Sequence, residues 1–228
     1  MDDRIKTYCI DIRQLKEENY QQAHELLSPY RRQKVALLKH ERDKKRSLGA
    51  AVVLDRALME YGLRERSMEY EIGRYGKPYL RDYPEIHFSL SHSGEYAICS
   101  IGGTPVGNDI EIIKEGRLQV AQRFFSIQET SWIYRVDDRR EQEERMFRIW
   151  TMKESFLKVT GLGMSLQLNS FAIESRRDEK FFVDHNINGK TYHLKEYNEW
   201  MCGFDDRYRL AVCSESAAFA QEPEMIRL

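Results

Sequence analysis

The chain has 228 residues, of which 41% are hydrophobic and 32% charged, with 36 basic and 37 acidic side chains. This length suits one large domain or two small ones, and the composition excludes a disordered or fibrous chain. A net charge of −1 argues against a general nucleic-acid binder, so any cationic site must be local.

The sequence predicts neither a membrane segment nor a zinc site. No stretch approaches about 18 consecutive apolar residues, and the acidic N-terminus is unlike a signal peptide. No CxxC pair occurs, and no two histidines have HxxxH spacing. The cysteines are Cys9, Cys99, Cys202 and Cys213. We therefore expect reduced thiols and a cytoplasmic protein.

The first half of the chain is predicted to be helical and basic. A short strand is expected over residues 8–12. Ser28 and Pro29 then supply an N-cap and a first helical residue, which predicts a helix to about residue 39. A second helix is predicted over 41–61, ended by Gly62. Eight lysines or arginines and two acids lie between residues 31 and 46.

Residues 86–113 are predicted to form three strands joined by two tight turns. Apolar Ile86, Phe88 and Leu90 alternate with polar residues, which is the period of a half-buried strand. The turns are expected at Ser93-Gly94 and at Gly102-Gly103, as in consecutive hairpins. The second turn is also the predicted boundary between two halves of similar size, residues 1–103 and 104–228.

Helices are predicted beyond that boundary over 117–125 and 129–134, followed by a solvated charged connection over 137–144. A long helix is predicted over 145–160, because apolar residues recur there at spacings of three, four and seven, and Gly161 ends it. Strands are expected around 171–173, 181–183, 191–197 and 209–213.

The stretch from Gly107 to Glu111 holds the first candidate site. Asp109 and Glu111 lie two apart on a predicted strand, so their side chains leave the same face about 7 Å apart. Two such carboxylates can share a magnesium ion, which prefers oxygen ligands and often completes its shell with substrate phosphates and water. The alternative interpretation is a charged, solvent-exposed face of an edge strand.

The predicted long helix holds the second candidate. Glu154 and Lys158 are four apart, so they could form an ordinary surface ion pair. Glu154 also lies near Trp150 around the helix, at the edge of an apolar stripe, which favours a site. A third stretch, Ser89-Leu90-Ser91-His92-Ser93-Gly94, is a predicted strand that ends in a histidine flanked by hydroxyls, although a lone histidine more often has a structural role than a catalytic one. The chain has no GxSxG, GxxxxGKS/T or GxGxxG motif, which argues against hydrolases, kinases and NAD enzymes.

In order and combination these stretches resemble the 4′-phosphopantetheinyl transferases, in particular the long, monomeric type that activates surfactin synthetase. The resemblance covers most of the chain. It rests on Ser28-Pro29, Tyr75-Gly76-Lys77-Pro78, Phe88-Ser89-Leu90-Ser91-His92-Ser93-Gly94, Gly107-Asn108-Asp109-Ile110-Glu111, Arg123-Phe124-Phe125-Ser126, the stretch from Trp150 to Lys158, and Gly161-Leu162-Gly163-Met164-Ser165-Leu166.

The resemblance implies an α+β (α/β) fold of two pseudo-twofold related halves, each a small sheet packed with helices. Coenzyme A would bind in the cleft between them, with Mg²⁺ or Mn²⁺ on its pyrophosphate. Asp109, Glu111 and Glu154 fall on the metal-binding acids, and Glu154 and Lys158 on the catalytic positions. The positions that hold coenzyme A are Arg31, Lys34, Arg46, Lys77, Pro78, Ser91, His92, Lys153 and Lys158.

The reaction implied is attack by a serine hydroxyl of an apo acyl or peptidyl carrier protein on the β-phosphate of coenzyme A, which releases 3′,5′-ADP. The carrier is expected to dock on residues 116–134, whose apolar members include Phe124, Phe125, Ile127 and Trp132. These side chains could equally belong to the core. No nucleic-acid or membrane partner is expected, and the enzyme is expected to be a monomer.

Asn108 departs from the family pattern, which has an aliphatic residue there. Strand alternation places Asn108 with Val106 and Ile110 on the core face, so its amide must find hydrogen-bond partners. Arg31 is a milder departure, since lysine is also found at that position. Two alternative functions remain: a coenzyme A or carrier binding module without turnover, which the three acids disfavour, and a nucleic-acid binder, which the lack of interleaved aromatic and basic residues disfavours.

Overall fold

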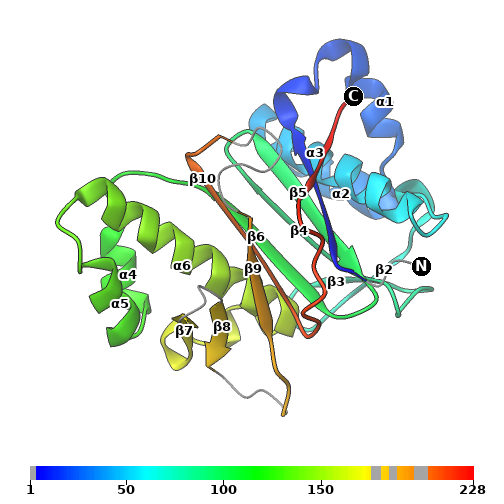
Figure 1. Ribbon diagram of the computed structural model, residues 1–228. Helices are drawn as coiled ribbons and strands as arrows, with labels where there is room; N and C mark the ends of the chain where they lie inside the picture. Colours follow the sequence, from blue (N-terminus) through cyan, green and yellow to red (C-terminus); the bar gives the residue numbers. More distant parts are fainter. Residues whose placement is uncertain (1–3, 176–180, 185–188, 198–204) are drawn as a thin grey trace.

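A computed structural model describes residues 4–175, 181–184, 189–197 and 205–228 of the chain. Two main sheets lie in the middle of the molecule, with one group of helices beyond each of them (Figure 1). The fold is therefore α+β, as expected. Cys202 lies outside the described residues, and no described helix is long and apolar enough to cross a bilayer.

The first sheet has the strand order β11-β1-β5-β4 and packs against α3. The elements of this half of the chain are β1 (Lys6–Asp11), α1 (Glu17–Glu25), α2 (Pro29–Ala36), α3 (Glu41–Met59), the hairpin β2 (Tyr70–Ile72) and β3 (Pro78–Leu80), β4 (His87–Ser93) and β5 (Tyr96–Gly102). The Ser28 hydroxyl caps α2 as predicted, and Gly62 follows α3 with a φ of +72°. Helix α2 ends three residues before the predicted residue 39, where exposed Leu37 no longer contributes to the core.

The second sheet has the order β6-β10-β9-β8-β7 and packs against α6. Its elements are β6 (Val106–Ile112), α4 (Leu118–Phe124), α5 (Ile127–Ile133), α6 (Arg139–Thr160), β7 (Ala172–Ser175), β8 (Phe181–Asp184), β9 (His193–Glu196) and β10 (Tyr208–Ser214). Strand β6 pairs with β10 and not with β5, so the predicted second hairpin is wrong. Gly102-Gly103 carries the chain from one sheet to the other.

The predicted solvated connection over 137–144 is also wrong, because most of it forms the first two turns of α6. Asp138 is the N-cap, and its carboxylate accepts a hydrogen bond from Glu141 N at 2.8 Å. Ion pairs at i,i+4 spacing, such as Arg145 with Glu141, support these exposed turns. The charged residues stabilise a helix here, whereas the prediction assigned them to a loop.

The two sheets share a core. Cys9 and Ile98 of the first sheet pack with Val106, Ile110 and Val212 of the second. Each sheet therefore has one face against its own helices and one face against the other sheet. The last strand, β11 (Glu224–Ile226), runs parallel to β1, so the first sheet takes strands from both ends of the chain (Figure 1).

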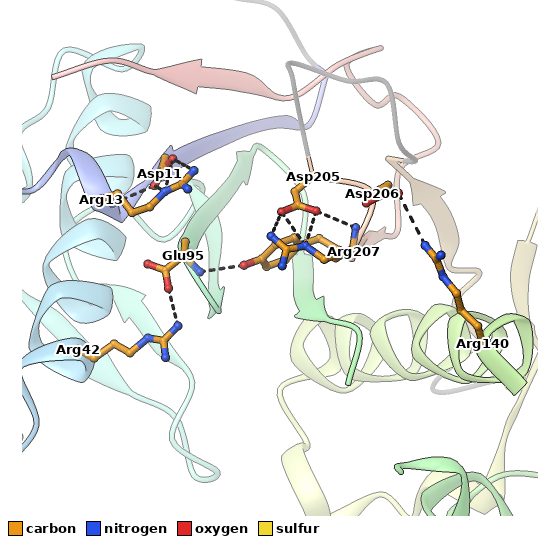
Figure 2. A network of polar contacts seen from close by, with 9 residues as sticks. Asp11, Arg13, Arg42, Glu95, Arg140, Asp205, Asp206 and Arg207 are labelled. Carbon is orange, nitrogen blue, oxygen red and sulfur yellow. Dashed lines mark hydrogen bonds and ion pairs between the residues drawn. The ribbon is translucent and has the colours of Figure 1, made fainter. Parts of the chain in front are cut away.

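Polar contacts also join the two halves at the β4–β5 turn. Glu95 N donates to Tyr208 Oη of β10 at 3.0 Å, and Arg42 of α3 pairs with the Glu95 carboxylate (Figure 2). Gly94 in the same turn has a φ of +55°, and a Cβ there would lie 2.0 Å from Tyr208 Oη. The turn thus needs glycine for both its backbone conformation and its close contact.

Candidate active site

Helix α6 lies directly on β6, because Gly107 has no side chain to separate them. A Cβ at Gly107 would lie 2.0 Å from Ser155 O and 2.4 Å from Val159 N. Asp109 and Glu111 alternate with the core-facing residues of β6, and their face of the strand is the one that α6 covers. The close approach brings Lys158 within 2.7 Å of Asp109 Oδ1.

Asp109 is the centre of the cluster. It is buried, with 4% of its surface exposed, and its Oδ1 accepts hydrogen bonds from Lys158 Nζ and from Ser91 Oγ at 2.8 Å. Its Oδ2 is also buried but has no hydrogen-bond partner among the described residues. Such an unsatisfied carboxylate oxygen is costly unless a ligand supplies the missing partner. Glu111 Oε2 accepts a hydrogen bond from Ser93 Oγ at 2.7 Å.

Burial and the charge of Asp109 raise the pKa of the other two acids of the cluster. Burial and then the charge of Asp109 raise the pKa of Glu154 to about 7, with a further contribution from Glu111, while Lys158 opposes the shift. Burial and Asp109 also raise the pKa of Glu111. The site therefore has an excess of negative charge, which a divalent cation would relieve.

The donor set fits Mg²⁺ or Mn²⁺ better than a zinc-type ion. In the described part of the chain, no group of three or more His, Cys, Asp or Glu side chains is by itself arranged to hold a metal ion. Carboxylate oxygens from Asp109, Glu111 and Glu154 are hard ligands, and Asp109 Oδ2 is unpartnered. Magnesium typically takes one or two carboxylates and completes its octahedron with phosphate oxygens and water. The residues present thus fit an ion that binds together with a phosphate ligand.

A pocket of about 290 Å³ opens beside the cluster. Its walls include Tyr75, Lys77, Pro78, Leu90, Glu154, Leu157, Lys158 and Gly161. The Lys77 ammonium donates to Lys158 O at 2.6 Å and to Val106 O at 3.1 Å, and burial lowers its pKa to about 8. Lys77 therefore ties the end of α6 to the start of β6 while its stem lines the pocket.

Arg46 and His92 form a second polar group at the end of β4. Arg46 Nε donates to Gly94 O at 3.0 Å, and its Nη1 lies 3.3 Å from Asp43 Oδ1. Desolvation by the surrounding protein lowers the pKa of His92, and the charges of Arg46 and Lys158 lower it further. Lys34 is exposed on α2, with its ammonium 5.1 Å from the centre of the Tyr30 ring.

The sequence of this chain is similar to those of known proteins. Residues 105–213 match the family model described as the 4′-phosphopantetheinyl transferase superfamily. The chain is 33% identical to the 4′-phosphopantetheinyl transferase Sfp of Bacillus subtilis (strain 168), over 97% of each chain. The chain belongs to the 4′-phosphopantetheinyl transferase superfamily.

One further relative and one solved structure complete the comparison. The 4′-phosphopantetheinyl transferase psf-1 of Bacillus pumilus is 32% identical over 97% of this chain and 95% of its own length. A holo-(acyl-carrier-protein) synthase from Bacillus anthracis str. Ames, solved in complex with CoA (3′,5′-ADP), is 15% identical with a TM-score of 0.41. That match covers 49% of this chain and 94% of the other.

Two of the cationic residues expected to hold coenzyme A are buried and do not line the pocket beside the acid cluster. Lys153 has no exposed surface: its ammonium pairs with Glu129 Oε1 at 2.9 Å and donates to the carbonyl oxygens of Leu168 and Phe171. Lys153 is one position from Glu154, which turns it about 100° around the helix, away from the cleft. Its expected role in binding is therefore corrected to a structural one.

Arg31 is the second such position. Only 8% of its surface is exposed, and its Nε lies 3.0 Å from Glu65 Oε1 inside the first half. The Glu65 carboxylate also accepts hydrogen bonds from Ser28 Oγ and Tyr70 Oη. Basic composition cannot distinguish an exposed arginine from one that neutralises a buried acid. We therefore do not keep Arg31 among the ligand-binding residues.

Three residues in the site or its support had no role assigned from the sequence. Ser93 holds Glu111, Ser89 accepts a hydrogen bond from Asn108 N at 3.0 Å, and Glu129 pairs with Lys153. The serines had a signal in the sequence, because Ser89, Ser91 and Ser93 recur with the period of a strand. Asn108 was expected to need hydrogen-bond partners for its side-chain amide. Its Nδ2 donates to Ser89 O and to Ser100 Oγ, both at 3.0 Å.

Proposed function

We propose that the chain transfers the 4′-phosphopantetheine group of coenzyme A to a serine of an apo carrier protein, with a divalent cation, and releases 3′,5′-ADP. The observation that carries this proposal is the cluster of Asp109, Glu111 and Glu154 beside Lys158. One buried carboxylate oxygen of this cluster has no hydrogen-bond partner among the residues that the structure describes. Family membership makes the chain a phosphopantetheinyl transferase, and the cluster supplies the chemistry that such a transfer needs.

Asp109, Glu111 and Glu154 would hold Mg²⁺, with Mn²⁺ as a substitute. Bound there, the ion would neutralise charge on the pyrophosphate of coenzyme A. Glu154, whose pKa is raised to about 7, would accept the serine proton directly or through a water. The serine oxygen forms a bond to the β-phosphorus as the bridging P–O bond breaks, and Lys158 stabilises the charge that develops on the leaving 3′,5′-ADP.

Coenzyme A would be held from two sides. The pocket lined by Lys77, Pro78 and Lys158 would receive one part of the ligand, and Arg46, His92 and Lys34 would bind its phosphates. A terminal phosphate is best fixed by several convergent donors, and arginine contributes a fork of them. Ser91 would contribute to this site through Asp109, because its hydroxyl proton already points to that carboxylate.

The carrier would dock on α4 and α5. Phe125 is buried and Trp132 packs on the same core, but Phe124 is 36% exposed and Ile127 is 84% exposed. A hollow of about 220 Å³ beside α4 is lined by Glu111, Arg117, Val120 and Trp150, among others. This hollow offers a route for the carrier serine to reach the cluster.

We also propose that the enzyme acts as a cytoplasmic monomer. Cys99 and Cys213 are buried thiols in the described part of the chain, and burial raises the pKa of both, so they are unreactive. Buried unreactive thiols suit a reducing compartment.

The test is incubation of the purified chain with coenzyme A, Mg²⁺ and a panel of apo acyl and peptidyl carrier proteins. We expect a gain in carrier mass equal to one phosphopantetheine group, and no gain in excess chelator. Binding of coenzyme A without modification of any carrier would identify a non-catalytic binding module instead. Asp109→Ala and Glu154→Ala are expected to lower turnover at least ~10²-fold.

A further inference from the structure

Three serines of β4 form a ladder to the edge of β6. Ser89, Ser91 and Ser93 alternate along the strand, so their hydroxyls leave the same face. Each accepts a hydrogen bond from a backbone N–H that lies 19 residues further along the chain. The N-to-Oγ distances are 3.0 Å for Asn108 to Ser89, 3.4 Å for Ile110 to Ser91 and 3.1 Å for Ile112 to Ser93. We call these three contacts the serine ladder.

The serine ladder replaces a missing strand partner. In the described sheets β4 pairs with β5 and β6 pairs with β10, so β4 and β6 do not exchange backbone hydrogen bonds. The N–H groups on the free edge of β6 would be buried without acceptors, which native structures avoid. Serine hydroxyls satisfy them, and the two halves of the molecule are joined where the active-site acids begin.

The ladder also fixes the direction in which two of the hydroxyl protons point. A backbone N–H can only donate, so each serine oxygen acts as the acceptor and its own proton remains to be donated elsewhere. Ser91 donates to Asp109 Oδ1 at 2.8 Å, and Ser93 donates to Glu111 Oε2 at 2.7 Å. Ser89 contacts no carboxylate among the described residues, because the corresponding position of β6 is Gly107, which has no side chain.

One oxygen of each carboxylate is therefore committed, and the other is left for a ligand. Asp109 Oδ2 is the clearest case, since it is buried and unpartnered in the described structure. A carboxylate that could rotate freely would lose conformational entropy on binding an ion, whereas one held by a hydroxyl is already oriented.

We propose that Ser91 and Ser93 are positioning residues that orient Asp109 and Glu111 for the divalent cation. This inference rests on the metal site of the proposed function. The two serines touch the ion's ligands and act through them. The serine ladder thus couples the seam between the two halves to the geometry of the active site.

The test is a measurement of the affinity for Mn²⁺. Electron paramagnetic resonance reports the concentration of the free ion, with coenzyme A present at saturation. Loss of a residue that orients metal ligands commonly weakens metal binding about 10–100-fold. We expect Ser91→Ala and Ser93→Ala each to raise the Mn²⁺ dissociation constant at least ~10-fold. Ser89→Ala is the matched control, because it removes a rung of the serine ladder that has no carboxylate contact in the described structure. We expect it to change the Mn²⁺ dissociation constant less than ~2-fold.

A rescue variant separates orientation from stability. Ser93→Thr keeps the hydroxyl, and we expect its Mn²⁺ affinity to be close to that of the wild type. The comparison of Ser93→Ala with Ser93→Thr tests the proposal even if Ser91→Ala fails to fold. Equal weakening in all three alanine variants, no weakening in any of them, or a wild-type chain that binds no Mn²⁺ would overturn the proposal. Carrier modification is assayed separately: a chain that shows the expected Mn²⁺ pattern but modifies no carrier would contradict the proposed function and leave this inference intact.

Discussion

Arg46 shows how a single cation of a basic helix can be assigned to a ligand. Its Nε is fixed by Gly94 O, which points the guanidinium toward the end of β4, where His92 also lies. We expect Arg46→Ala to weaken coenzyme A binding about 10–100-fold, the loss expected for a charge-assisted contact, and to leave 3′-dephospho-coenzyme A binding nearly unchanged. Calorimetric titration with both ligands measures the contrast. Lys44→Ala is the control, since Lys44 pairs with Glu41 on the exposed side of the same helix.

Lys153 lies on α6, the helix that carries Glu154 and Lys158, but its own contacts are structural. Lys153→Met would leave the Glu129 carboxylate buried without its counter-ion, and we expect a loss of about 3–5 kcal/mol in the free energy of unfolding. Denaturant unfolding measures this loss. Coenzyme A affinity of the folded variant is expected to stay at the wild-type value. A stable variant with weakened coenzyme A binding would return Lys153 to the ligand site.

Lys77 links stability to pH. Burial lowers its folded pKa from 10.5 to about 8, so between those values the unfolded chain binds more protons than the folded chain. The stability contributed by this position therefore rises as pH increases from about 8 to 10.5. We expect the difference in unfolding free energy between wild type and Lys77→Met to shift in favour of the wild type over this range. A difference that is independent of pH would show that the carbonyl contacts keep Lys77 fully charged.

Among the helices and strands, the contact between α6 and β6 sets the position of Glu154 and Lys158. Gly107→Ala would place a methyl group against Ser155 O and Val159 N and force α6 outward. Because a displacement of about 1 Å can cost ~10²-fold in rate, we expect at least that loss in turnover. Gly103→Ala is the control, as a Cβ there has no neighbour within 4 Å. Wild-type turnover in Gly107→Ala would show that α6 can adjust without moving Glu154 and Lys158.

The elements that were predicted well are those whose signals lie within a few residues. Ser28 caps α2, Gly161 ends α6 with a φ of +69°, and the alternation around Phe88 marks β4. The start of α6 was missed, because charged residues without an apolar stripe resemble a loop. The Asp138 cap with acidic and basic residues at i,i+4 spacing was the signal that could have identified it.

For the whole molecule, the carrier is the partner that must approach from outside. Carriers of this kind are usually acidic, so the exposed Arg123 on α4, which stacks on Phe124, is expected to steer the encounter. We expect Arg123→Glu to raise the apparent KM for the carrier several-fold at low ionic strength, with less effect in high salt. The KM for coenzyme A is expected to remain unchanged.

Arg13→Glu is the matched control for this charge reversal. Arg13 follows β1 in the first half, far from α4 and α5, and pairs with Asp11 on the surface (Figures 1 and 2). It is expected to leave carrier kinetics unaltered. Equal effects of the two reversals would indicate a response to net charge and would contradict a docking surface on α4 and α5.

The family, the α+β class and the residues of the acid cluster could all be inferred from the sequence, because they depend on short motifs in a fixed order. Asp109 and Glu111 share a face through strand alternation alone, and Glu154 and Lys158 share one through the helical repeat. These relations hold wherever the strand and the helix are placed in the molecule.

Pairings between distant segments were decided by packing. β6 pairs with β10, about a hundred residues away, because its apolar face completes the core between the sheets, and no local pattern distinguishes that partner from β5. The same reason explains Arg31 and Lys153. Each is a cation in a basic or mixed stretch, and in the folded chain each pairs with a buried acid, Glu65 or Glu129, whose burial no local pattern reveals.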